Sequence, residues 1–154
     1  MWYVPVIFTT IGFLFMEGFS HFFHKHVLHG ILWHVHRTHH RPSKSFFELN
    51  DAVSLFFGLL STGLIVFGFD QGIAGMAYLG IGMAIYGMLY FILHDVVVHR
   101  RVKGVKYKPA NRYFAALRRA HMQHHRHLDR TPGESYGLFI FPAKFYHQQK
   151  EINS

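Results

Sequence analysis

The sequence contains no cysteine. Disulfide bonds and thiolate metal sites are therefore excluded, and any bound metal must be held by nitrogen or oxygen ligands. Acidic residues are also few, with 8 Asp and Glu against 16 Lys and Arg. The zinc protease motif H-E-x-x-H is missing, and so is the Glu and Glu-x-x-His pattern of ferritin-like di-iron proteins. A hydrolytic zinc site and a carboxylate-rich di-iron site are both disfavoured.

Charge is almost absent from three long hydrophobic runs. Residues 4–23 carry a single charged side chain, Glu17, and residues 52–69 and 73–93 carry none. A helix of about 20 apolar residues can cross a bilayer. The sequence therefore predicts three transmembrane helices, the last two joined by the polar turn Asp70-Gln71-Gly72 as an antiparallel hairpin.

Small residues recur at four-residue spacing in this hairpin, a pattern that suits close helix packing in lipid. They are Ser54, Gly58 and Thr62 in one helix and Gly80 and Ala84 in the other. The alternative, a hairpin buried in a soluble core, needs more protein than 154 residues supply. We therefore expect one all-α integral membrane domain over residues 1–154, with cap segments 24–44 and 94–154 outside the bilayer.

The apolar stretch 136–146 raises the question of a fourth span. It is too short to cross a bilayer as a helix, so we expect it to lie in the membrane interface. If it were a true span, the C-terminus would lie on the opposite side of the membrane.

The basic residues are confined to one side of the predicted topology. All 16 Lys and Arg lie within residues 25–44 and 100–150. Both segments follow an odd number of crossings, so they share one membrane face, and the positive-inside rule makes that face cytoplasmic. The excess charge of +8 is thus expected to contact lipid headgroups, and nucleic-acid binding is disfavoured.

Ten of the fifteen histidines form four clusters with two spacings, each used twice. The H-x4-H spacing joins His24 with His29 and His94 with His99, and the H-x2-H-H spacing joins His36, His39 and His40, and then His121, His124 and His125. Imidazole is the commonest metal ligand in proteins. The repeated clusters therefore predict a multi-histidine metal site on the cytoplasmic face.

The two spacings make different geometric predictions. Residues at i, i+3 and i+4 share a helix face, so H-x2-H-H directs three imidazoles the same way. Residues five apart lie roughly 140° apart on a regular α-helix. The H-x4-H pairs therefore either bind different metals or lie where the helix ends or distorts, as in a π-bulge. Ten imidazoles are too many for one ion, which favours two. Iron acting on oxygen is our first choice, with zinc left open.

Two carboxylates are candidates for supporting roles. Asp95, next to His94, is predicted to accept a ring N–H and orient that ligand, with simple solvation at a helix end as the alternative. Glu17 is an intramembrane carboxylate and so a functional candidate; it could equally reach the interface or pair with an Arg. The five remaining histidines are not expected to be ligands; they are His21, His26, His34, His127 and His147. The alternative for His26 and His34, which lie among the ligands in the sequence, is that either supports or replaces one of them.

The ordered histidine clusters and their flanks resemble the membrane fatty acid hydroxylase and sterol desaturase superfamily. More narrowly, they resemble the bacterial non-haem di-iron β-carotene hydroxylases. The flanks are Met16-Glu17, Leu32-Trp33, Arg119-Ala120 and the stretch 133–139, and the resemblance covers residues 12–146. It implies that the ten clustered histidines bind two iron ions, with zinc as a substitute in purified protein. It also implies a bacterial inner-membrane location.

The resemblance further implies an O2-dependent reaction at C3 of the β-ionone rings of β-carotene, giving β-cryptoxanthin and zeaxanthin. A ferredoxin or NAD(P)H system would supply electrons. Two alternatives remain. One is a fatty acid or sphingolipid hydroxylase or a sterol desaturase with the same ligands, and the other is a non-enzymatic membrane protein that binds zinc.

Overall fold

The computed structural model describes residues 2–41, 45, 47–105, 111–126 and 134–147. All regular structure among these residues is helical. In chain order it comprises α1 (Tyr3–Phe23), the π-helix η1 (His24–Ile31), α2 (Trp33–His40), α3 (Asp51–Asp70), α4 (Ala74–Tyr90), the π-helix η2 (Phe91–Val98), α5 (Arg112–Arg126) and the 3-10 turn η3 (Ala143–Tyr146). The predicted all-α fold is confirmed.

Three helical runs are long and apolar enough to cross a membrane: Tyr3–Ile31, Asp51–Asp70 and Ala74–Val98. They match the predicted spans, but the first and third continue as π-helix beyond the apolar stretch. The fourth-span alternative is not supported, because residues 134–142 follow an irregular path and, up to residue 147 where the described part ends, only the short turn η3 follows them.

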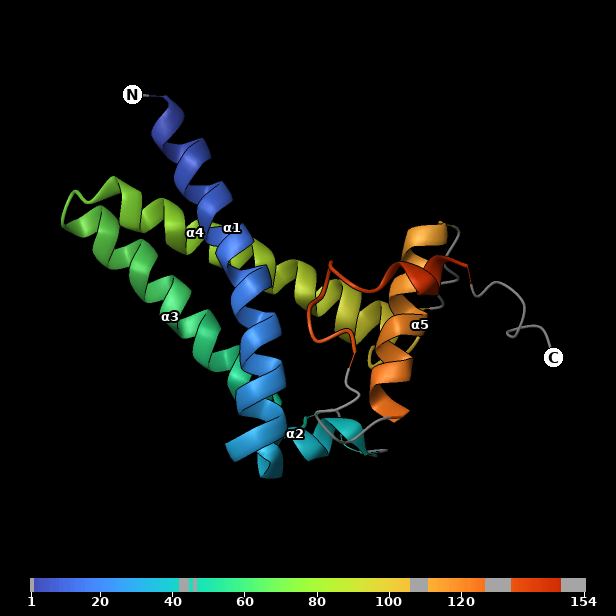
Figure 1. Cartoon of the computed structure of the whole chain (residues 1–154). Helices are drawn as coiled ribbons and strands as arrows, with labels where there is room; N and C mark the ends of the chain where they lie inside the picture. Colours follow the sequence, from blue (N-terminus) through green and yellow to red (C-terminus); the bar gives the residue numbers. More distant parts are fainter. Residues whose placement is uncertain (1, 42–44, 46, 106–110, 127–133, 148–154) are drawn as a thin grey trace.

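The three spans pack as a hairpin with a crossing helix, and Figure 1 shows α1 lying across α4. Glycines permit this contact. A Cβ on Gly12 would collide with the carbonyl oxygen of Leu79, and one on Gly82 with that of Thr9. The α3–α4 turn contains Gly72 at φ 69°, a backbone conformation that side chains disfavour. The predicted turn is confirmed.

The expectation of close packing along the small residues of α3 and α4 is only partly correct. A Cβ on Gly80 would come within 2.8 Å of the Ser61 carbonyl oxygen, so the two helices touch there. A Cβ on Gly58 would meet nothing within 4 Å. Figure 1 shows α3 and α4 diverging away from their turn. Ser54, Gly58 and Thr62 consequently line a cavity instead of a helix contact.

The cap is held against the spans by the segment 134–147. Phe145, only 1% exposed, packs on Ala116 and Ala120 of α5. The Arg119 guanidinium donates to the Phe145 carbonyl oxygen, with Nη2 at 2.6 Å and Nε at 3.1 Å. Leu138 joins the buried cluster formed by α1, α4 and η2. The segment therefore links α5 to the ends of the spans, where the histidines lie.

Candidate metal centre

Both H-x4-H pairs are associated with π-helix. His24 and His29 fall within η1, whereas His94 lies in η2 and His99 is the residue that follows its last turn. The His99 N–H donates to the His94 carbonyl oxygen at 2.9 Å, an i to i+5 hydrogen bond. This hydrogen bonding brings residues five apart onto neighbouring turns of the same face, which a regular α-helix does not do. Of the two alternatives for this spacing, the structure shows the distorted helix.

The histidines converge into two groups whose candidate ligand atoms lie within 4.8 Å of one another. The first group is His24, His29, His36, His40 and His124, and the second is His39, His94, His99 and His121. His125 lies between them. Its Nε2 is 2.9 Å from that of His121, and its ring stacks on His40 with the centroids 4.2 Å apart. All ten clustered histidines therefore meet in one place.

The two H-x2-H-H motifs interlock. His36 and His40 join the first group, whereas His39 from the same helix joins the second. The second motif mirrors this arrangement, with His124 in the first group and His121 in the second. Each motif directs its imidazoles into the shared cluster, but the expectation did not foresee that they divide between the two groups. Only the i and i+4 members share a centre, because the third histidine is rotated about the helix axis toward the other group.

Three members of the first group have a defined tautomer, because each Nδ1–H donates to an oxygen. The pairs are His24 with the Tyr136 carbonyl at 2.9 Å, His36 with Asn50 Oδ1 at 2.8 Å, and His124 with the Glu134 carbonyl at 3.1 Å. A neutral imidazole carries one N–H. Nε2 of each of these rings is therefore an unprotonated lone pair.

These lone pairs face one another at short range. Nε2 of His24 lies 2.9 Å from that of His36 and 3.1 Å from that of His124. Two lone pairs cannot share a hydrogen bond, but they can bind one cation between them. Burial lowers the pKa of His36 to about 3 and that of His40 to about 2, which keeps both rings neutral. The donor set therefore fits a metal ion that prefers imidazole.

The second group is built in the same way. His39 Nδ1 donates to Glu48 Oε2 at 3.1 Å, and its Nε2 lies 3.1 Å from Nε2 of His94. Nε2 of His99 and His121 are 2.8 Å apart. Burial lowers the pKa of His99 to about 3 and places that of His121 well below its usual value. This group too offers neutral nitrogens to a cation.

Asp95 does not make the predicted hydrogen bond. Its Oδ1 lies 3.4 Å from His94 Nδ1 but forms no hydrogen bond with it, and instead accepts from Arg101 Nη1 at 2.7 Å. Arg101 also binds both carboxylate oxygens of Asp51, at 2.8 Å and 2.7 Å. Asp95 thus contributes to an ion-pair network that connects η2 with the start of α3 beside the second group.

Two supporting residues were missed in the sequence, Glu48 and Asn50. They lie just before α3 and fold back over α2, where the Asn50 N–H donates to Thr38 Oγ1 at 3.4 Å. Their positions give a weak signal, because they are polar residues at the entrance to an otherwise apolar span. Tyr136, within the stretch 133–139, was not singled out either, but its ring lies 5.4 Å from that of His24 and 5.0 Å from that of His124.

Glu17 is buried and holds the segment after Tyr136. Its Oε1 accepts from the N–H groups of Phe139 and Ile140, both at 2.9 Å. Its Oε2 accepts from the Leu138 N–H at 3.2 Å and the Tyr86 hydroxyl at 3.0 Å. The carboxylate therefore ties α1 to the segment whose carbonyls at 134 and 136 receive the Nδ1–H donors of the first group.

The described histidines outside the clusters do not enter either group. His21, His26, His34 and His147 are all exposed. His127 lies outside the described residues.

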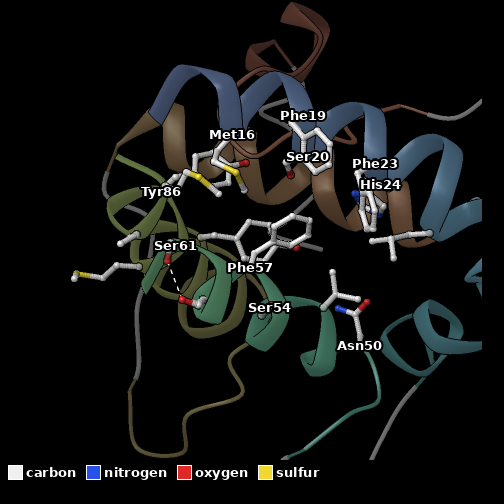
Figure 2. Close-up of a pocket in the computed structure, with 18 of the residues that line it drawn as sticks. Met16, Phe19, Ser20, Phe23, His24, Asn50, Ser54, Phe57, Ser61 and Tyr86 are labelled. Atoms are coloured by element: carbon white, nitrogen blue, oxygen red, sulfur yellow. Dashed lines mark hydrogen bonds between the residues drawn. The ribbon is translucent and has the colours of Figure 1, made fainter. Parts of the chain in front are cut away.

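An apolar cavity of about 360 Å³ lies between α1, α3 and α4. Figure 2 shows Phe19 and Phe23 of α1 facing Phe57 of α3, with His24 and Asn50 at the same end of the cavity. His24 belongs to the first group, and Asn50 orients its neighbour His36. A hydrophobic molecule within the membrane could thus reach the histidine cluster.

The sequence matches the fatty acid hydroxylase family over residues 9–143. The chain belongs to this family. It is 36% identical to the β-carotene hydroxylase of Pseudescherichia vulneris, covering 92% of this chain and 78% of that protein. It is 35% identical to the β-carotene hydroxylase of Pantoea ananas, covering 92% and 79%. The chloroplastic β-carotene hydroxylase 1 of Capsicum annuum is 36% identical, covering 84% and 41%. No solved structure matches.

As a member of the fatty acid hydroxylase family, the chain is a hydroxylating enzyme, as the resemblance implied. The histidine cluster agrees with the non-haem dinuclear centre expected of such a hydroxylase. The purely metal-binding alternative is correspondingly disfavoured.

Proposed function

We propose that this hydroxylase uses O2 to hydroxylate β-carotene at C3 of the β-ionone rings, giving β-cryptoxanthin and then zeaxanthin. The observation that carries the proposal is the convergence of Nε2 lone pairs at one end of an apolar cavity between membrane helices. A carotene is long, apolar and dissolved in lipid, so it suits this cavity. The names of the similar proteins from Pseudescherichia and Pantoea support the substrate.

The two groups would hold one iron ion each, with His125 completing the second. The ligands would be His24, His29, His36, His40 and His124 for the first ion and His39, His94, His99, His121 and His125 for the second. When bound, the iron pair supplies the activation of O2. Zinc fits the same nitrogens and would substitute during overexpression.

The protein's own residues would bind and shield the substrate. Phe19, Phe23 and Phe57 provide an apolar wall for the polyene, and the ring to be oxidised would lie near His24. The Tyr136 ring covers the first group and would help to exclude water. Exclusion of water protects reactive intermediates from side reactions. Each hydroxylation consumes one O2, two electrons and two protons, replaces a C–H by C–OH and releases one water.

Topology provides the remaining parts of the proposal. The chain would form a single domain in a bacterial inner membrane, with its basic segments and histidine cluster on the cytoplasmic side. An acidic ferredoxin-like donor, itself reduced by NAD(P)H, would deliver electrons to that side. Complementary charge would speed its encounter with the basic face.

The test is expression in cells that accumulate β-carotene, together with a matching electron donor. We expect β-cryptoxanthin and zeaxanthin by chromatography, and none of either with the His124→Ala variant. Absence of hydroxylated carotenoid from wild-type protein with a good electron supply would refute the substrate.

The family description favours one second candidate, hydroxylation of a fatty acyl chain. The ligands would be unchanged and the cavity would hold a linear chain. The same cells can decide, because hydroxylated fatty acids in their lipid extract, without hydroxylated carotenoid, would favour this candidate.

A further inference from the structure

The cavity is open on one side. Part of its lining is buried, including His24, Asn50 and Tyr86. Two other lining residues, Gly58 and Gly87, are exposed. They come from α3 and α4, the helices that diverge from their shared turn (Figure 1). The opening between these helices is therefore where a molecule dissolved in the bilayer can enter.

The register of the hairpin places the two glycines opposite each other. A Cβ on Gly80 would come within 2.9 Å of Ile65 Cγ1, so these residues face one another across the antiparallel pair. Seven residues, about two helical turns, separate Ile65 from Gly58 and Gly80 from Gly87. A shift of two turns away from the α3–α4 turn leaves the same side of each helix facing the other. Gly58 therefore lies opposite Gly87.

Helix packing does not explain these two glycines. A Cβ added at either position would meet no atom within 4 Å. Both glycines line the cavity, so a larger side chain at either position would project into open space at its edge. Ser54 and Thr62, one turn on either side of Gly58, also line the cavity with small side chains. The open strip along α3 therefore continues through Gly58 toward Asn50.

We infer that Gly58 and Gly87 form a window that sets the width of the cavity for the cyclic end of the substrate. The two glycines are specificity-determining residues, an inference that rests on the proposed carotenoid substrate. A methyl-substituted six-membered ring is wider than an extended polyene or acyl chain. A branched side chain on either glycine would narrow the window enough to obstruct the ring before it obstructs an acyclic chain.

The experiment compares Gly58→Leu and Gly87→Leu with the matched control Gly63→Leu. Gly63 lies on α3, meets nothing within 4 Å when a Cβ is added, is exposed and does not line the cavity. Its substitution therefore makes the same change in helix propensity without narrowing the window. The variant Gly58→Ala tests whether the loss grows with the size of the side chain at this position.

Two readouts apply to each full-length, metal-loaded protein. The first is the amount of β-carotene, or of an acyclic carotene, retained per chain on purification. The second is kcat/KM for β-carotene. We expect both Leu window variants to lose roughly tenfold or more in β-carotene retention and kcat/KM, and less in retention of the acyclic carotene. Gly58→Ala, with its smaller side chain, should lose less than Gly58→Leu, and Gly63→Leu should stay within about twofold of wild type.

The inference is overturned if the window variants match Gly63→Leu, if both carotenes are lost equally, or if wild-type protein retains neither. Circular dichroism and metal content identify a variant that has not folded, in which case Gly58→Val replaces it. A wild-type protein that retains β-carotene but forms no hydroxylated product would refute the proposed function. The role of Gly58 and Gly87 would then be judged from the retention of the two carotenes alone.

Discussion

The two histidine groups share one plan but differ in what supports them. The first is backed by neutral oxygens, the carbonyls of Tyr136 and Glu134 and the amide of Asn50. The second is backed by the Glu48 carboxylate and lies beside the ion pairs of Asp95. A carboxylate raises the basicity of the imidazole that donates to it. The second group should therefore bind a cation more tightly, while the first group, through His24, borders the substrate cavity.

The largest effect is expected where the two groups interlock. His39 and His124 each leave their own motif and complete the other group, so either substitution by Ala should abolish hydroxylation. The loss should exceed the roughly 10- to 100-fold effect of losing an outer partner. Carotenoid products and bound metal measured on the purified variants check this, with the exposed His147→Ala as the control. Full activity in either ligand variant would show that the grouping is wrong.

The next prediction tests whether the different charges behind the two histidine groups give them different metal affinities. Glu48→Gln removes the negative charge behind His39, so metal affinity of the second group should fall by roughly 10- to 100-fold. Asn50→Asp places a charge behind His36 and should tighten the first group. Competition with a chelator, measured on both variants and wild type, gives the two affinities. Unchanged affinities in both variants would mean that the supporting charges do not distinguish the groups.

A smaller effect is expected at Glu17, which acts through the segment after Tyr136. Glu17→Gln replaces an oxygen that accepts backbone N–H groups with an amide NH2, which cannot accept them. We expect the free energy of unfolding to fall by roughly 1–3 kcal/mol. Chelator competition should show weaker metal binding in the first group only. Tyr86→Phe, which removes a single donor to Glu17, is the milder control. Equal weakening of both groups would contradict a role through this segment.

The spans and the histidine cluster could be predicted from the sequence because each has a strong local signal. Charge is missing from residues 52–69 and 73–93, and transfer of charge into lipid is costly. The spacing from His24 to His29 does not suit a regular helix, so a distortion could be foreseen as one of two alternatives. Choosing between these alternatives required the structure, where one pair lies within a π-helix and the other lies at the end of one.

The division of each H-x2-H-H motif between two centres could not be foreseen. His36, His39 and His40 lie broadly on one face, and only the position of the other histidines decides which centre each ring meets. Glu48 was missed for the same reason, because its contact with His39 depends on how the chain folds back. The small residues around Gly58 indicated close helix packing. A cavity beside a helix also requires small residues, so the sequence pattern is the same in both cases. Only the divergence of the helices separates these two outcomes.

The most direct test of the central claim is the metal content of protein prepared anaerobically and saturated with iron. Two separate groups of buried, neutral imidazoles predict about two iron ions per chain. One iron ion or none at saturation would contradict the account.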